Sequence, residues 1–347
     1  MKGNLLIVKK RIYSLFIALV LSLACASAFV ALGQTRRASG SAQVKPSLLS
    51  ALPASDAVMQ IDVQRLLNDA LPRIYANDSA KMAQINAEID KFKTQTGIDA
   101  RSFDRVVLGA RFIDLENGKT KVETVALAHG TFKAATIVAA GRLAAQGKYR
   151  EQKYNGATIY IFNINDQVKL LGLLDIKVSE LAVSALDAST LAIGDADNVR
   201  AATDSRNGRA RVANALVQLA SRNAGAIIGF GANLPSSVTQ GLNVPNDEIA
   251  RNIASIRQVY GSLGTVEKGF DAVVFARTEN ADQARGLSET IAALKQFAPL
   301  ISGRVAGPKG KLARNALESL QVSAQGNELQ LRLSLAQTDI AALLLGR

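Results

Sequence analysis

The chain has 347 residues, with 41 Lys and Arg against 29 Asp and Glu, and its formal net charge is +12. Apolar residues make up 48% and charged residues 20%, which is the composition of a folded globular protein and excludes a disordered chain. One Cys, one His and no Trp exclude a Cys/His zinc site, a Cys–His nucleophile pair and a disulfide scaffold.

The first 33 residues have the pattern of an export signal. Four basic residues precede an uncharged stretch from Ile12 to Leu32, and Ala26-Ser27-Ala28 fits the A-x-A cleavage pattern of a secretory signal peptide. The stretch also reaches the length of ~20 residues that a membrane-spanning helix needs, so an uncleaved anchor is the alternative. A lipoprotein attached through Cys25 is a third. In each case the positive-inside rule places the rest of the chain outside the cytoplasm, and we expect a periplasmic or extracytoplasmic protein.

Composition divides the remainder of the chain. Residues 34–48 are rich in Gly, Ser, Ala and Arg, which is typical of a flexible tether. The length that follows is enough for two units, which we place at 49–205 and 206–347. The polar, turn-rich segment Asp204–Arg211 marks the boundary between them.

Pairs of similar segments indicate an internal duplication. Residues 87–107 match residues 254–274 at a single offset of 167 positions. Leu181–Ala185 resembles Leu320–Ala324, each opening a pair of strands that runs into a helix. A rival alignment pairs 122–129 with 273–277. We therefore expect a repeated order of elements and leave the register open.

Three stripes of apolar residues at helical spacing predict amphipathic helices. Asp78 and Gly97 bound the first as N-cap and stop, and Asn280 with Gln283 form a capping box before the third. The stripes are Met82, Ile85, Ile89 and Phe92; Ile249, Ile253, Ile256 and Val259; and Ala284, Leu287, Ile291, Leu294 and Phe297.

Strands are predicted by alternation and by turn residues. Leu329–Leu335 alternates apolar and polar residues as a half-buried antiparallel strand does, after a turn at Gly326-Asn327. Asn155-Gly156 predicts a β-hairpin. The fold class is therefore α+β: two tandem similar units, each a mostly antiparallel sheet packed with amphipathic helices, after an N-terminal apolar signal or anchor helix.

The opening of the first unit resembles that of a known family. Leu52-Pro53-Ala54-Ser55-Asp56-Ala57, followed by a strand that ends at Asp62, is similar to the start of a family of uncharacterised exported bacterial proteins. The resemblance implies an N-terminal signal or anchor and duplicated α+β units. It implies no catalytic residues.

Two motifs that resemble ligand sites are better explained by packing and capping. Gly229-Phe230-Gly231 lacks the third Gly of a dinucleotide-binding turn, so we expect close packing at a strand end. Asp187, Asp195 and Asp197 approach a calcium loop, but its next ligand position is Val199. Asp195 or Asp197 is expected to cap the helix that follows, and Asp62 to do the same before 63–67.

No catalytic, metal or cofactor residues are predicted. His129 has no second His and no nearby Cys, so we interpret it as a structural or surface residue. A Ser or Thr nucleophile with a Lys base leaves little signal in a sequence, and the residues select none.

Basic residues with interleaved tyrosines suggest contact with an anionic membrane or polymer surface. Scattered solvated charge is the simpler interpretation. Nucleic acid is not expected as a partner, because the chain is exported and has no Trp for stacking. The candidate residues are Arg142, Lys148, Arg150, Lys153, Lys309, Lys311 and Arg314.

Taken together, these features predict a non-enzymatic binding or scaffolding module of the cell envelope, with an envelope protein or anionic surface as its partner and no cofactor. The alternatives are an extracytoplasmic hydrolase with a Ser or carboxylate site and a periplasmic carrier of an apolar ligand. The oligomeric state stays open.

Overall fold

The computed structural model describes residues 47–115, 120–170, 174–240, 247–267, 269–296 and 307–345. The predicted signal or anchor at 1–33, and all of the tether except its last two residues, lie outside the described residues. Among the helices that are described, none combines the length and the apolar character needed to cross a bilayer.

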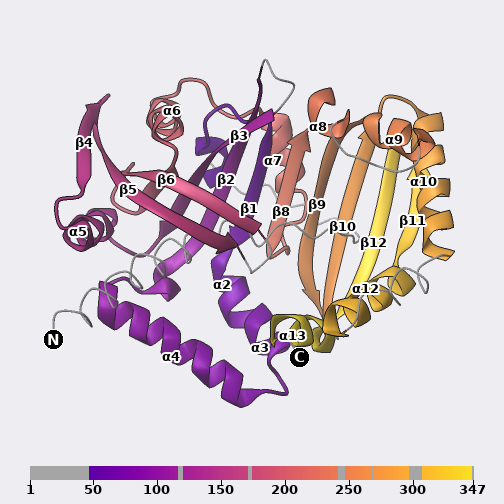
Figure 1. Ribbon diagram of the computed structural model, residues 1–347, viewed down its shortest axis with the longest axis horizontal. Helices are drawn as coiled ribbons and strands as arrows, with labels where there is room; N and C mark the ends of the chain where they lie inside the picture. Colours follow the sequence, from indigo (N-terminus) through magenta and orange to yellow (C-terminus); the bar gives the residue numbers. More distant parts are fainter. Residues whose placement is uncertain are drawn as a thin grey trace, which may run out of the picture.

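Twelve described strands form one antiparallel sheet, with helices along its rim and faces (Figure 1). From the centre outward, the first half runs β1, β2, β3, β7, β6, β5, β4, and the second runs β8, β9, β10, β12, β11. The bounds of the first half are β1 Ala57–Asp62, β2 Phe103–Asp114, β3 Thr120–Gly130, β4 Tyr149–Tyr154, β5 Ala157–Leu170, β6 Leu174–Ala185 and β7 Thr190–Gly194. Those of the second are β8 Ile228–Asn233, β9 Ile256–Val266, β10 Gly269–Thr278, β11 Gln321–Gln325 and β12 Glu328–Ala336.

The two halves of the sheet pair their strands in the same order. Outward from the centre, β1–β2–β3–β7–β6 corresponds to β8–β9–β10–β12–β11. They meet where β1 pairs antiparallel with β8, Ile61 lying opposite Ile228. The predicted units at 49–205 and 206–347 thus share one continuous sheet. The segment at their expected boundary is bonded to the start of the first unit: Ala54 N–H donates to Ala210 O (2.7 Å), and Val212 N–H donates to Leu52 O (3.1 Å).

The sequence match at an offset of 167 is wrong as a structural register. It aligns Ile89, in a helix, with Ile256, at the start of β9. The rival alignment matches β3 with β10 as corresponding strands. A helix follows each of them: α5 (Ala134–Ala145) and α10 (Ala281–Gln296). Leu181–Ala185 lies at the end of β6, and residues 320–324 run into β11.

The local signals for the first and third helices are confirmed. α4 (Ser79–Thr96) begins after Asp78, whose carboxylate accepts from Lys81 N–H (2.9 Å), and it ends at Gly97 with φ 72°. That positive φ suits glycine, which has no Cβ to clash. α10 begins with the expected capping box, in which Asn280 Oδ1 accepts from Gln283 N–H (3.0 Å).

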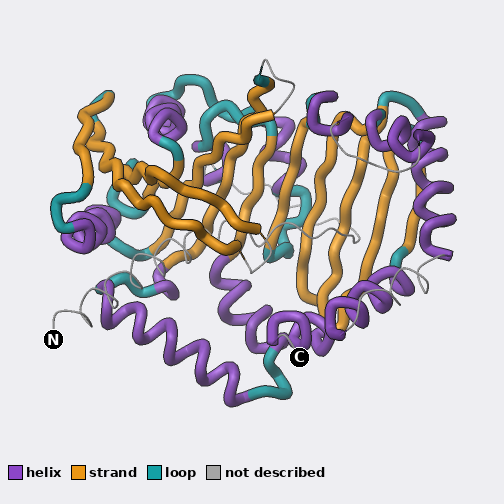
Figure 2. The backbone as a smooth tube through the Cα atoms, in the orientation of Figure 1, coloured by secondary structure: helices purple, strands orange, loops and turns teal. Residues whose placement is uncertain are grey.

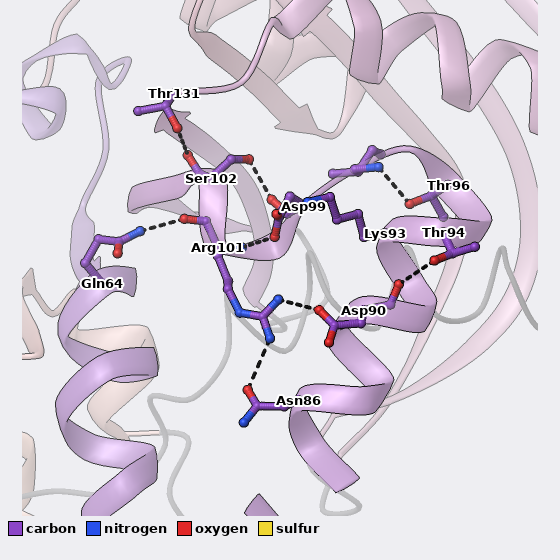
Figure 3. Close-up of polar contacts among 11 residues, drawn as sticks. Gln64, Asn86, Asp90, Lys93, Thr94, Thr96, Asp99, Arg101, Ser102 and Thr131 are labelled. Atoms are coloured by element: carbon purple, nitrogen blue, oxygen red, sulfur yellow. Dashed lines mark hydrogen bonds and ion pairs between the residues drawn. The ribbon is translucent and has the colours of Figure 1, made fainter. Parts of the chain in front are cut away.

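The C-terminal part of α4 is fixed to the body of the protein by one buried side chain and several polar contacts. Of its predicted apolar stripe Phe92 is buried, and the other three members are half-buried. Arg101, in the short helix η3 (Ala100–Ser102), donates to Asp90 (2.6 Å) and to Asn86 (3.1 Å), as Figure 3 shows. Lys93 forms an ion pair with Asp99 (2.8 Å). α4 is therefore secured by a polar network at one end.

The second predicted helix is shorter than its stripe. α9 (Asp247–Ala254) ends before Ser255, whose hydroxyl donates back to Asn252 O (2.6 Å). Ile256 and Val259 belong to β9, so their assignment to this helix is wrong. β-branched and aromatic residues favour a pleated strand, and here pairing with β8 and β10 decides between the two structures.

Residues that lie directly opposite in paired strands share a face, so the register divides the sheet into two faces. Face A carries Ile61 and Val274, and face B carries Val58 and Tyr260. The helices over face A contribute Ile137 of α5, Ala70 of η2 and Leu287 of α10 to its apolar clusters. Those over face B are η1, α6 and α7. The remaining helical bounds are η1 Leu48–Ala51, α2 Val63–Arg65, η2 Leu66–Ala70, α3 Leu71–Ile74, α6 Ala196–Arg206, α7 Asn214–Ala220, α8 Ser236–Gln240, α12 Gly307–Ser319 and α13 Gln337–Leu345.

The predicted hairpin and the last strand are confirmed. Asn155 and Gly156 have φ values of 45° and 82°, the two positive angles of the tight turn that joins β4 to β5. β12 follows the turn at Gly326-Asn327 as expected. Asp62 caps α2 by accepting from Arg65 N–H (2.9 Å), which confirms that prediction too.

Candidate functional site: an arginine–aromatic cluster on face B

The candidate site begins with the close contact of α7 and β8. A Cβ atom on Gly229 would lie 2.0 Å from Ala220 O, and one on Gly231 would lie 3.0 Å from Leu219 Cβ. The two glycines therefore let the helix lie directly on the strand, which confirms the predicted close packing. α7 ends at Ala220 with Ser221 as its C-cap, and the next residue, Arg222, extends over the neighbouring strands.

Beneath Arg222 two aromatic rings are stacked. Tyr260 of β9 and Phe275 of β10 are directly opposite in the ladder, with ring centroids 4.9 Å apart and an interplanar angle of 14°. The Arg222 guanidinium carbon is 5.3 Å from the centroid of Tyr260 and 4.8 Å from that of Phe275. This is cation–π geometry with both rings.

The phenol group of Tyr260 joins the charged members of the cluster. It accepts from Arg222 Nη1 (2.8 Å) and donates to the carboxylate of Glu328 on β12. Arg277 of β10 forms an ion pair with the same carboxylate (3.0 Å). The carboxylate is thus shared by Tyr260 and Arg277, whereas no described carboxylate lies within ion-pair distance of Arg222. Arg222 is thus an exposed residue whose guanidinium is held in place by Tyr260 and by the two rings.

Burial, followed by the hydrogen bond to the Glu328 carboxylate, raises the pKa of Tyr260 to about 12. Both effects disfavour the phenolate, the first because charge is poorly solvated inside a protein. At neutral pH the hydroxyl is therefore protonated and fixes the orientation of the two arginines.

The raised pKa of Tyr260 predicts a late step in an alkaline titration. Its folded-state pKa lies above the ordinary tyrosine value of 10.0, so the bound proton stabilises the fold. That contribution is complete below pH 10 and is lost as the pH rises from about 10 to about 12. After a rapid pH jump, tyrosinate absorbance of the folded chain should contain one step near pH 12 that Tyr260→Phe removes. A folded chain whose tyrosines all ionise near pH 10 would contradict the assignment.

The structure separates the seven basic residues that the sequence suggested. Arg142 on α5, Lys148 just before β4, and Arg150 and Lys153 on β4 lie at one end of the sheet. The others lie on α12, which packs against β12 toward the opposite end (Figure 1). Arg142 is paired with Glu151 (3.1 Å), and Arg150 with Glu180 (2.7 Å). They do not form one patch.

The remaining candidates differ in their surroundings. Lys153 donates to Thr158 (2.7 Å), and Lys311 lies 3.7 Å from the buried carboxylate of Asp339. Lys148 and Arg314 are both exposed. The Lys309 side chain lies outside the described residues. Anionic contact at these positions stays a prediction.

Two sequence candidates have ordinary structural surroundings. His129 Nδ1 is 2.9 Å from Asp104, both side chains are about half exposed, and no hydroxyl or thiol in the described chain bonds to its Nε2. Asp195 stands at the N-cap position of α6, but its carboxylate accepts from Thr124 N–H of β3 (3.1 Å). Asp197 instead pairs with Arg200. Asp195 is therefore the N-cap residue as predicted, but its carboxylate bonds to β3 and not to the first turn of the helix.

No three His, Cys, Asp or Glu side chains within the described ranges are grouped closely enough to hold a metal ion. The sequence argument missed every member of the arginine–aromatic cluster. Alternation in 273–277 places Phe275 and Arg277 on one face of a strand, which is a usable signal. The pairing of that strand with Tyr260 and Glu328 is not readable from one sequence.

Comparison with known proteins gives solved structures only. No family model matches the chain, and no curated protein matches it. The Treponema protein TP0453 in crystal form III is 12% identical, with a TM-score of 0.47, covering 88% of this chain and 99% of that one. Crystal form I gives 11% and 0.44 with the same coverage, and form IV gives 13% and 0.42, covering 85% and 95%. At these values the likeness carries no function to this chain.

Proposed function

We propose that the chain is a non-enzymatic binding module of the cell envelope that holds an anionic group at Arg222. The observation that carries this proposal is a guanidinium stacked on two rings, bonded to Tyr260 and free of any described carboxylate. Such a group loses little freedom when it binds a carboxylate or phosphate, and it offers paired donors to planar or tetrahedral oxygens. Export to the envelope rests on the pattern of residues 1–33.

The site is suited to binding rather than to proton transfer. Its hydroxyl has a pKa raised away from neutrality, and its carboxylate is already shared by Tyr260 and Arg277. A general acid or base works best with a pKa near the working pH, which this cluster does not provide. The excess of basic residues over the whole chain would favour approach of an anionic partner.

The test measures binding of the full chain to two anionic probes: vesicles that contain phosphatidylglycerol, and soluble polyglutamate. We expect Arg222→Gln to weaken binding of the recognised probe by about tenfold, the effect of losing one charge-assisted hydrogen-bonded pair. Arg285→Gln is the matched control, because Arg285 is also exposed but pairs with Asp282 (3.0 Å). It should change affinity less than twofold.

The two probes separate a lipid surface from an acidic polymer as the source of the anion. If both variants lost binding equally, the loss would come from the change in net charge alone, and the role of Arg222 would be overturned. Failure of the native chain to bind either probe at low salt would overturn the proposed function itself.

A further inference from the structure

The outermost strand of the second half, β11, is an edge strand, and no described strand pairs with its outer side. Among the described strands β11 pairs with β12 alone, and β4 forms the opposite edge of the sheet. Four of the five residues of β11 are exposed: Gln321, Ser323, Ala324 and Gln325. The outer edge of such a strand carries backbone N–H and C=O groups without a neighbour in the sheet.

The sequence of β11 and its pairing with β12 also lack the features that usually block strand addition. Its sequence, Gln-Val-Ser-Ala-Gln, contains no charge and no proline, and its pairing with β12 runs without a bulge. The opposite edge, β4, carries Arg150, Glu151 and Lys153. Charged side chains, above all lysines, are a common protection of edge strands. The two edges of this sheet thus differ, and β11 is the receptive one.

The first half shows how a strand in this position is covered. β6 occupies the place that β11 has in the second half, and β5 pairs with it antiparallel. Tyr160 lies opposite Val183, and Phe162 lies opposite Leu181. The likeness of Leu181–Ala185 to residues 320–324 places Val322 where Val183 stands. Within the described residues, nothing in the second half fills the place of the β4–β5 hairpin.

A helix lies beside the free edge. α10 contacts β11 more than any other strand, and Figures 1 and 2 show it at the outer end of the sheet. Val322 points to that side and packs with Leu287 and Ile291 of α10. In the first half α5 packs in the same way beside β6, where Tyr160 and Phe162 extend the apolar cluster. A strand added to β11 could therefore place apolar side chains against α10, as β5 places them in the cluster of α5.

We propose that β11 binds an extended segment of another protein by antiparallel strand addition, with apolar residues of that segment at alternate positions toward α10. The hydrogen-bond ladder would supply affinity and the alternate side chains specificity. A partner is favoured over a second copy because the chain keeps an excess of basic residues even without the four of the predicted signal or anchor, so two copies repel each other. The partner segment would add along the outer side of β11, whereas Arg222 stacks over β9 and β10 on the far side of β12.

The probe is a fluorescent peptide with the sequence of residues 157–163 of β5 carrying Ile159→Thr and Ile161→Thr. In β5 these isoleucines face the buried side of the first half, and on β11 the same positions would face polar side chains. Binding to the full chain is followed by fluorescence anisotropy. Amide hydrogen exchange reports whether residues 321–325 become protected.

We expect the peptide to bind and to slow exchange across β11, while a scrambled peptide does neither. Ala324→Lys should weaken binding at least tenfold, because it places a charge on the edge beside the apolar residues of the peptide. Ala292→Lys, the same change at an exposed position of α10, should leave affinity within twofold. Arg222→Gln should not alter peptide binding, so failure here is distinct from failure of the anion site.

Several outcomes would overturn the inference. These are absence of peptide binding to the native chain, equal loss in Ala324→Lys and Ala292→Lys, or protection outside 321–325. A native dimer that Ala324→Lys dissociates would assign the edge to a second copy and refute the partner segment. Far-ultraviolet circular dichroism checks that both variants are folded, and both substituted side chains are exposed.

Discussion

Truncation of Tyr260 to alanine is expected to lower the free energy of unfolding by about 3–5 kcal/mol, the range for deleting a large buried aromatic side chain. Tyr260 is the largest fully buried side chain described. Its ring supports both Phe275 and Arg222, so the variant loses the stacked pair as well as the buried area. Urea unfolding at neutral pH measures the change.

Tyr260→Phe is the matched control, because it keeps the ring and removes only the hydroxyl. Tyr260→Phe should lower the free energy of unfolding by about 0.5–1.5 kcal/mol. This is the net contribution of a hydrogen bond when the groups that lose their partner can still bind water. Arg277 and Glu328 keep their own ion pair in that variant. Equal losses for the two substitutions would show that the ring contributes nothing beyond its hydroxyl, and the packing argument would be wrong.

Gly229→Ala should destabilise the protein by about 1–3 kcal/mol, because the new methyl group would overlap the backbone of α7. The added Cβ atom would lie 2.0 Å from Ala220 O, and backbone cannot move aside as a flexible side chain can. α7 must shift, and Arg222 follows that helix directly. The variant should therefore also weaken anion binding, which links stability and function in one measurement series.

Gly264→Ala provides the comparison on the next strand. A Cβ atom there would meet nothing closer than 3.8 Å, which is ordinary contact. Its free energy of unfolding should stay within about 1 kcal/mol of the native value, since the change mainly removes unfolded-chain entropy. If both glycine variants lost the same stability, the close approach of α7 would not be the cause.

The parts of the fold that were predictable are those decided within a few residues. The turn at Asn155-Gly156 and the capping box at Asn280 depend on local backbone angles and donors, so their signals survive in a single sequence. The end of α9 was not predictable in this way. Ile256 continues the helical spacing of Ile253, and only its neighbours in β8 and β10 make it a strand residue.

The candidate site illustrates the same limit. Arg222, Tyr260, Phe275 and Glu328 lie on four different segments, and of the four only Phe275 has another member of the cluster, Arg277, near it in sequence. Their meeting depends on strand order and on the register between β9, β10 and β12. The basic residues chosen from the sequence form two groups, at 142–153 and 309–314, and the order of the strands places these groups toward opposite ends of the sheet.

The pairing of β1 with β8 has a practical consequence for any attempt to divide the molecule. Cutting between 205 and 206 would leave β1 as the bare margin of one fragment and β8 as that of the other. Both strands carry buried apolar side chains, Val58 and Ile61 on one and Ile228 on the other. Unpaired strands with apolar side chains of this kind recruit other chains into mixed aggregates. The protein is therefore best purified whole, and complementary halves would need to be produced together.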